Sequence, residues 1–317
     1  MNPKWAKWIH RNLFPCCFGR NCIVPNLGYI SEAAASFVDR QLGLGIVPRT
    51  EIVLLASPSF HYSARQRWNH YLFGIPLPPK IGSFQLFLEG YQDSTSFFKN
   101  GYTSARNRSL NWTHVNQQEF QAGFERLVIL DYLIRNTDRG SDNWMVKHSL
   151  ISSDGNLGSS STDTLNNITS MVSVAGIDHG LAFPTKHPIR VRSYPYGWLL
   201  NPIATREFSK ETIQLVLPTL SSPAKWHELI SGIETLFKID SDFSAATYKL
   251  QKSVLQGQRY NLVETLQNSS SFPESPVTLC ARKLVIVHED DGSSRGIIGK
   301  IGDRMEILAG SAVFTSC

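Results

Sequence analysis

Apolar and polar positions along the chain recur with two different periods, one typical of helices and one of strands. Residues 117–136, QQEFQAGFERLVILDYLIRN, repeat apolar side chains every three or four positions, which predicts a long helix. Residues 226–237 have the same spacing and predict an amphipathic helix, and residues 244–266 predict another. Residues 31–45 predict a helix, because Ser31 is a suitable N-cap at the start and Gly43 and Gly45 lie at the end.

Short β-rich runs predict strands at residues 51–56, 82–91, 144–147 and 171–178. The last two flank the Ser-, Asn- and Gly-rich residues 151–170, which suggests a hairpin with a disordered insertion at its tip. Residues 57–80 mix polar, aromatic and proline positions and predict a loop or linker. The later runs KLVIVHEDD and RMEILAGSAVF have strand character, but the sequence offers them no obvious partner.

The polar loop RNTDRGSDNW, residues 135–144, directly follows the apolar run LVILDYLI. Asp138 and Asn143 have the spacing of a phosphoryl-transfer loop, in which the Asp orients an acceptor hydroxyl and the Asn binds Mg²⁺. Asp178 precedes a glycine after the predicted hairpin, where a second metal ligand belongs. Asp138 taken alone is more simply explained as a turn or cap residue. Asp138, Asn143 and Asp178 in this order, with a helix before and a hairpin between, favour a phosphoryl-transfer site.

Composition limits the functional classes without choosing one. The chain has 317 residues and a formal net charge of +5, enough for one or two domains and mildly basic. It has no long Lys/Arg block, so we expect no nucleic-acid partner and favour a phosphate ligand or an anionic membrane surface. Its five cysteines form no regular framework, which favours a reducing compartment. No apolar stretch is long enough for a transmembrane helix.

The first 22 residues combine aromatic, basic and cysteine positions. Trp5 and Trp8 share a predicted helical face, and Lys and Arg residues lie among them. This combination is typical of an interfacial membrane element, with Cys16 and Cys17 as candidates for S-acylation. A buried first helix with inert thiols explains the same pattern equally well.

Several motifs together resemble one family. The segments DYLIRNTDRGSDNWMVK and IDHGLAFPTKHPIRVRSYPYGW resemble the catalytic and activation segments of type II phosphatidylinositol 4-kinases. NPKWAKW, PCCFGRNC, SEAAASFVDRQLGLGIVPRT and LPPKIGSFQLFLEGY extend the resemblance over about residues 2–270. It implies an α+β, kinase-like fold and transfer of the ATP γ-phosphate to the 4-hydroxyl of phosphatidylinositol, with Mg²⁺ as the metal.

The resemblance also implies roles for individual residues. Asp138 corresponds to the catalytic Asp, and Arg139 lies beside the reacting centre, where it is expected to balance phosphate or headgroup charge. Asn143 and Asp178 correspond to the metal ligands. The hinge that meets adenine corresponds to Gln85, Leu86, Phe87 and Leu88.

The activation segment carries cations that the resemblance places opposite an anionic headgroup: Lys186, His187, Arg190 and Arg192. A solvated basic face is the alternative for each of them. Tyr196 and Trp198 are expected to touch lipid, with packing in the core as the alternative. By resemblance the protein is expected to be peripheral, on the cytoplasmic face of Golgi, endosomal or plasma membranes.

Two departures from the family pattern shape the predicted domains. The family's glycine-rich loop and ATP-binding Lys precede the NPKW motif, so residues 1–90 are expected to form an incomplete N-lobe with the membrane segment and hinge. Residues 91–270 are expected to form the mostly helical C-lobe, and residues 271–317 a divergent tail. Of the family's CCPCC motif only one cysteine pair remains. A lipid kinase is the leading prediction, and a catalytically inactive, membrane-docked binding module is the alternative.

Overall fold

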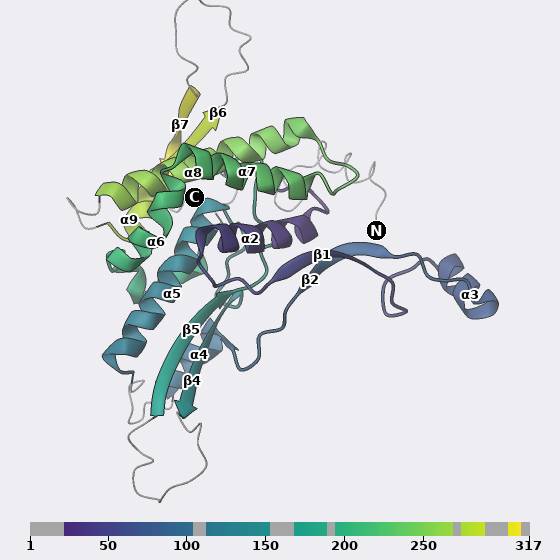
Figure 1. Ribbon diagram of the computed structural model, residues 1–317, viewed down its shortest axis with the longest axis horizontal. Coiled ribbons are helices and arrows are strands. Elements are labelled where there is room, and N and C mark those ends of the chain that lie inside the picture. Colours follow the sequence, from purple (N-terminus) through teal and green to yellow (C-terminus); the bar gives the residue numbers. More distant parts are fainter. Residues whose placement is uncertain are drawn as a thin grey trace, which may run out of the picture.

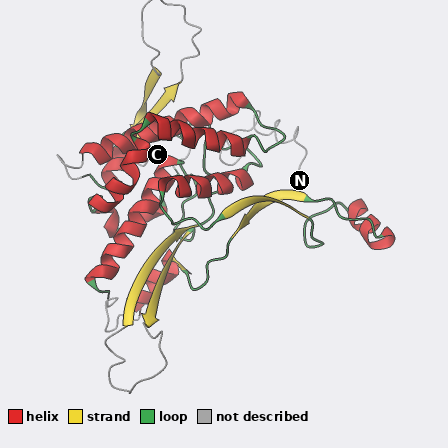
Figure 2. Ribbon diagram, viewed as in Figure 1, coloured by secondary structure: helices red, strands yellow, loops and turns green. Residues whose placement is uncertain are grey.

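A computed structural model of the protein describes residues 22–103, 112–152, 168–188, 194–268, 274–288 and 304–311. Its helices gather into a body, from which antiparallel pairs of strands extend in different directions (Figures 1 and 2). The mixture of helices and strands agrees with the predicted α+β class.

The N-terminal part of the described chain contains α2 (Gly28–Leu42), β1 (Thr50–Leu55), α3 (Ala64–Phe73) and β2 (Lys80–Gln85). Strands β1 and β2 form an antiparallel sheet in which Thr50 pairs with Gln85. Helix α2 begins before Ser31, which is buried inside it, so the predicted N-cap is wrong. The first turn closes instead when the backbone N–H groups of Ile30 and Ser31 donate to the Leu27 carbonyl.

Helix α3 contradicts the prediction of a loop over residues 57–80. Its N-cap Ser63 and Gln66 form a capping box, in which each side chain meets the backbone of the other. It ends at Gly74, which has the left-handed backbone that favours glycine. The sequence carried these two end signals and the helical spacing of Trp68, Tyr71 and Leu72, but the polar and proline residues on either side favoured a loop.

The middle of the chain contains β3 (Gln92–Asp93), α4 (Ser94–Thr103), α5 (His114–Leu133), β4 (Trp144–Ser152) and β5 (Ile168–Gly176). The sheet order is β3-β4-β5, and β4 pairs with β5 along its whole length. The predicted hairpin is therefore confirmed. Most of the predicted insertion at its tip, residues 153–167, lies outside the described residues.

The C-terminal part contains two short 3₁₀ helices, η2 (Gly197–Leu200) and η3 (Pro202–Thr205), and four α-helices. These are α6 (Lys210–Leu220), α7 (Pro223–Phe237), α8 (Ala245–Asn268) and α9 (Pro276–Ala281). The last strands, β6 (Lys283–His288) and β7 (Arg304–Ser311), pair with each other, which supplies the partner that the sequence did not reveal. Strand β6 lies against α8, so the start of the predicted tail belongs to the folded body.

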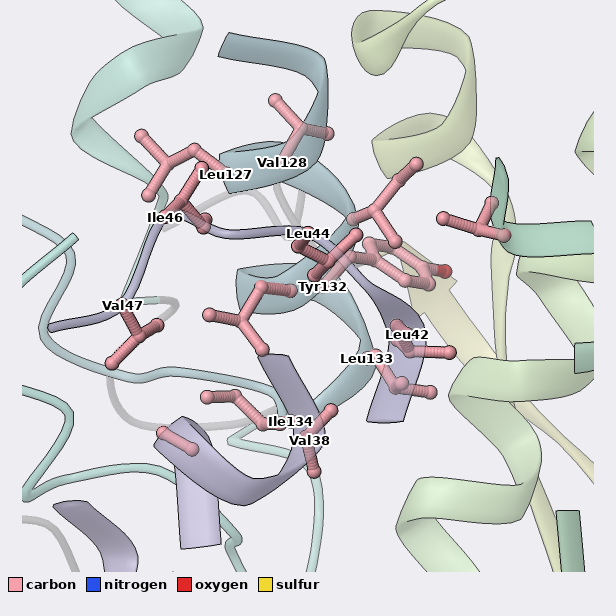
Figure 3. Close-up of a cluster of buried hydrophobic side chains, with 14 of the residues drawn as sticks. Val38, Leu42, Leu44, Ile46, Val47, Leu127, Val128, Tyr132, Leu133 and Ile134 are labelled. Atoms are coloured by element: carbon pink, nitrogen blue, oxygen red, sulfur yellow. The ribbon is translucent and has the colours of Figure 1, made fainter. Parts of the chain in front are cut away.

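The core is centred on the C-terminal half of α5. Figure 3 shows Leu127, Val128, Tyr132 and their neighbours packing against α2 and the loop that follows it. All eight residues from 127 to 134 are buried, because elements surround this half of the helix on every side. Each large apolar side chain buried in this way contributes roughly 1.5–3 kcal/mol. The packing therefore fixes the point at which the polar loop begins.

The contact between α8 and β6 depends on Gly257. A Cβ atom at this position would lie 1.7 Å from the carbonyl oxygen of Val285. This oxygen belongs to the backbone, so it cannot move aside as the end of a flexible side chain could. We expect Gly257→Ala to lower the free energy of unfolding by about 1–3 kcal/mol, measured by denaturant titration. Gly82→Ala is the control, because nothing lies within 4 Å of its Cβ position. Equal midpoints for the two variants would contradict this packing.

Candidate active site

The polar loop that follows α5 is tied to the segment that follows β5. The backbone N–H and the hydroxyl of Thr137 both donate to the Leu181 carbonyl, at 3.1 and 2.7 Å. The N–H of Ile177 donates to the Asn143 carbonyl at 3.1 Å. These bonds bring together the two segments that carry the predicted catalytic and metal-binding side chains, although Asp138 and Asp178 lie 40 positions apart in the sequence.

Two Asn side chains hold the backbone of Asp138. Its N–H donates to the Asn136 side-chain oxygen at 2.9 Å, and its carbonyl accepts from Asn143 Nδ2 at 2.9 Å. The Asp138 side chain is partly exposed, as a group that meets a substrate must be. Because Asn143 uses its amide nitrogen for this bond, its amide oxygen is the atom suited to a metal.

Asp178 lies among negative charges. It has a positive φ of 53° and an exposed side chain. Partial burial raises the pKa of its carboxyl, and the nearby charges of Glu32 and Asp138 raise it further. A divalent cation would relieve this repulsion, so the electrostatics favour a metal next to Asp178.

The available donors fit Mg²⁺ better than a metal enclosed by protein. Among the described residues, no group of three or more His, Cys, Asp or Glu side chains has the arrangement of a metal site. Asp178 and Asn143 supply one carboxylate and one amide oxygen. Mg²⁺ is commonly bound through one or two carboxylates, with phosphates and waters completing its coordination.

Glu32 on α2 adds a negative charge that the sequence did not suggest for the site. Its Oε2 lies 3.6 Å from Nδ1 of the fully buried His179. Burial opposes ionisation of Glu32, but its interactions with His179 and with the Gly180 amide outweigh that effect and lower its pKa. Glu32 therefore remains ionised near Asp178 at neutral pH.

A buried ion pair joins α5 to both parts of the site. Arg139 Nε donates to Asp131 Oδ2 at 2.8 Å, and both side chains are fully buried. Arg139 also donates to the carbonyls of Asn143 and Ile177, the second at 2.7 Å. One guanidinium thus contacts the backbone of the predicted Asn ligand and of the residue before Asp178.

This burial changes the role expected for Arg139. A guanidinium enclosed in the core and bonded to three protein oxygen groups is not placed to meet a phosphate or headgroup. We propose that Arg139 is a positioning residue, and that Asp131 is its partner in this role. The sequence analysis missed Asp131, although an acid inside the apolar run LVILDYLI was a signal of a buried, paired group.

Trp198 and Tyr196 also hold Asp131, the first at its carboxylate and the second at its backbone carbonyl. Trp198 Nε1 donates to Asp131 Oδ2 at 3.0 Å, and the Tyr196 hydroxyl donates to the Asp131 carbonyl at 3.3 Å. The two rings are stacked with centroids 4.8 Å apart, and both side chains are buried. These positions contradict the expected lipid contact and agree with the alternative of core packing.

The expected row of headgroup cations is only partly described. Lys186 is exposed, whereas His187 is buried and its Nε2 donates to the Val285 carbonyl at 3.2 Å. Burial, followed by the charge of Arg135, lowers the pKa of His187 to about 4, so it is neutral at physiological pH and the prediction of a cation there is wrong. Arg190 and Arg192 lie outside the described residues, as do Cys16 and Cys17.

The expected adenine hinge connects the β1–β2 hairpin to the helical body. Gln85 ends β2 and donates to the Thr50 hydroxyl at 2.8 Å, while the Leu86 N–H donates to the Arg49 carbonyl at 3.0 Å. Leu86 and Phe87 are exposed, and Leu88 is partly exposed. An adenine contact at these residues stays a prediction.

The helix, polar loop, β-hairpin and Asp-His-Gly segment follow one another in the order of a kinase-like fold. The chain belongs to the phosphatidylinositol 3- and 4-kinase family, whose model matches residues 1–236. It is 42% identical over 315 residues to phosphatidylinositol 4-kinase type 2-beta of Gallus gallus, an alignment that covers 94% of this chain and 63% of the relative. It is 40% identical over 310 residues to phosphatidylinositol 4-kinase type 2-alpha of Danio rerio, covering 90% and 65%.

The chain thus spans slightly less than two thirds of the length of the curated relatives it matches. The resemblance on which the sequence analysis relied is confirmed at the level of the family. Within the described residues, no helix has both the length and the apolar character needed to cross a bilayer.

Removing one partner of the buried ion pair between Asp131 and Arg139 should destabilise the fold strongly. We expect Arg139→Met to lower the free energy of unfolding by about 3–5 kcal/mol, because it leaves the Asp131 carboxylate buried without its cation. The double variant Asp131→Asn/Arg139→Met should be more stable than Arg139→Met alone, since no charge then remains. Denaturant titration of both variants measures the difference. A single variant within about 1 kcal/mol of the wild type would contradict the pairing.

Buried His187 should make stability depend on pH. Its folded pKa of about 4 lies below the ordinary 6.5, so as pH falls below 6.5 the proton binds preferentially to the unfolded chain. Stability contributed by neutral His187 is therefore present above pH 6.5 and is lost as pH falls toward 4. We expect roughly 2 kcal/mol of loss from this group between pH 7 and pH 5. His187→Gln, which keeps a donor for Val285, should lose correspondingly less; identical losses would contradict burial of the imidazole.

Proposed function

We propose that the protein is a lipid kinase that transfers the γ-phosphate of ATP to the 4-hydroxyl of phosphatidylinositol. The observation that carries this proposal is the joining of the Asp138 loop to the Asp178 segment by the bonds of Thr137 and Ile177. Membership of the phosphatidylinositol 3- and 4-kinase family supports the reaction class. The names of the type 2 relatives support phosphatidylinositol as the substrate and its 4-hydroxyl as the group that accepts the phosphate.

In the proposed reaction, the inositol hydroxyl oxygen forms a bond to the γ-phosphorus, and the bond from that phosphorus to the oxygen of the leaving ADP breaks. Asp138 orients the hydroxyl and accepts its proton. Its loop position suits this role, because Asn136 and Asn143 fix its backbone while its side chain remains partly exposed. Arg139 acts at a distance, by holding the backbone on both sides of the site.

Asn143 and Asp178 would hold Mg²⁺, which when bound supplies positive charge against the phosphate oxygens. The raised pKa of Asp178 gives a reason for the metal's position, since the carboxylate lies near two other negative groups. Gln85, Leu86, Phe87 and Leu88 are proposed to meet the adenine. Lys186 remains a candidate for contact with the lipid headgroup, because its side chain is exposed.

The proposed substrate resides in a bilayer, so the protein has to meet a membrane surface. The aromatic and basic segment at residues 1–22, with Cys16 and Cys17 as acylation sites, is our proposal for one contact. Localisation on the cytoplasmic face of Golgi, endosomal or plasma membranes is likewise a proposal that rests on the resemblance.

The two acids can be tested by conservative substitution. We expect Asp138→Asn to lower turnover by roughly 10²–10⁴-fold, because the hydroxyl loses its proton acceptor. Asp178→Asn should raise the Mg²⁺ concentration needed for half-maximal rate, because a charged ligand is lost. The measurement is transfer of labelled phosphate from ATP to phosphatidylinositol in detergent micelles.

Asp142→Asn is the matched control, because Asp142 is an exposed acid in the same loop with no role assigned to it. It should retain wild-type kinetics. A double Asp138→Ala/Asp178→Ala variant that turned over like the wild type would sink the proposal. So would a folded wild-type chain that failed to transfer phosphate to the lipid.

A further inference from the structure

Helix α3 carries a stripe of apolar side chains that the described fold leaves uncovered. Trp68, Tyr71 and Leu72 are spaced at i, i+3 and i+4, so they share one face of the helix. Their exposed fractions are 64%, 88% and 52%. Phe73, the last residue of the helix, and Ile75, just beyond its end, are exposed as well. Contiguous apolar surface of this kind marks an interaction site more often than a scattering of single side chains does.

The position of α3 removes core packing as an explanation. Figure 1 shows it at the outer end of the ribbon formed by β1 and β2, away from the helical body. None of its ten residues is buried. An isolated helix of this length is only marginally stable in water, and a capping box contributes about 1 kcal/mol. A surface that covers the stripe would supply the packing that α3 lacks.

The charges around the stripe indicate what that surface is. No Asp or Glu occurs from residue 52 to residue 88, whereas Arg65, Arg67 and Lys80 do. At 100° per residue, Arg65 projects on the Leu72 side of the stripe and Arg67 on its Tyr71 side. Trp and Tyr with flanking Arg residues are the side chains favoured at a membrane–water interface.

We infer that α3 docks on an anionic lipid bilayer. Trp68, Tyr71 and Leu72 enter the interfacial layer, and Arg65 and Arg67 lie at the level of the anionic headgroups. The expectation that the protein meets a bilayer rests on the proposed function, but the stripe and its charges do not. Docking through α3 would hold the β1–β2 hairpin against the membrane, separately from any contact made by residues 1–22.

The test is sedimentation of the purified, unacylated chain with vesicles of phosphatidylcholine alone or mixed with phosphatidylserine, without ATP. Replacing the stripe in Trp68→Ala/Tyr71→Ala/Leu72→Ala should weaken binding to the mixed vesicles at least about tenfold. Replacing the charges in Arg65→Gln/Arg67→Gln should weaken it by roughly ten- to thirtyfold at low salt, with a smaller effect at high salt. All variants keep residues 1–22, so a contribution from that segment is common to them.

Asn69→Ala is the control, because Asn69 lies outside the stripe and outside the capping box, and it should bind like the wild type. Because α3 lies outside the core, thermal unfolding should give the same midpoint for every variant. Wild-type chain that failed to bind the mixed vesicles, or a stripe variant that bound as well as the control, would overturn the inference. If the stripe variant lost self-association but still bound vesicles like the wild type, the inference would be overturned, and the stripe would instead be the contact with a second copy of the chain.

The same proteins separate this inference from the proposed kinase activity. Phosphorylation of a short-chain, water-soluble phosphatidylinositol should be unchanged in the stripe variant, because the reacting groups lie elsewhere. A chain that binds vesicles through α3 but transfers no phosphate would contradict the proposed function and leave the docking site in place.

Discussion

The buried ion pair between Arg139 and Asp131 is the interaction on which the arrangement of the site depends. Asp131 belongs to the most deeply buried part of α5, and its carboxylate accepts hydrogen bonds from Arg139 and Trp198. Through Arg139 the position of this helix is transmitted to the backbone at Asn143 and Ile177. The exposed side chains of the site therefore take their geometry from groups that are buried in the core.

This arrangement explains how a loop can hold the side chains of the candidate site in place. Loops usually lie at the surface and are more mobile than the elements they connect. Here the loop begins at a helix packed on all sides, and Thr137 and Arg139 fix it to the segment after β5. Only Asp138, Asn143 and Asp178 need remain accessible. The repulsion between the two carboxylates, together with the amide oxygen of Asn143, favours a divalent cation.

Local signals in the sequence were sufficient for the chemical motif and for part of the fold. The spacing of Asp138 and Asn143 and the strands on either side of the insertion follow from neighbouring residues, and the structure has the predicted β4–β5 hairpin. The burial of Arg139, His187 and Trp198 was not predictable in this way, because it depends on contacts with distant elements such as β6 and α5. Helix α3 was missed for another reason: it is short and buries none of its residues, and its three apolar positions at helical spacing are set among polar and proline residues typical of a loop.

The most direct test of the account is calorimetric titration of ATP into the folded chain, with and without Mg²⁺. If Asn143 and Asp178 are brought together to hold the metal with the nucleotide, binding should be saturable, should require Mg²⁺, and should weaken in an Asn143→Ala variant that unfolds at the wild-type temperature. Binding that is unaffected by Mg²⁺ and by this substitution would show that these residues do not form the nucleotide–metal site.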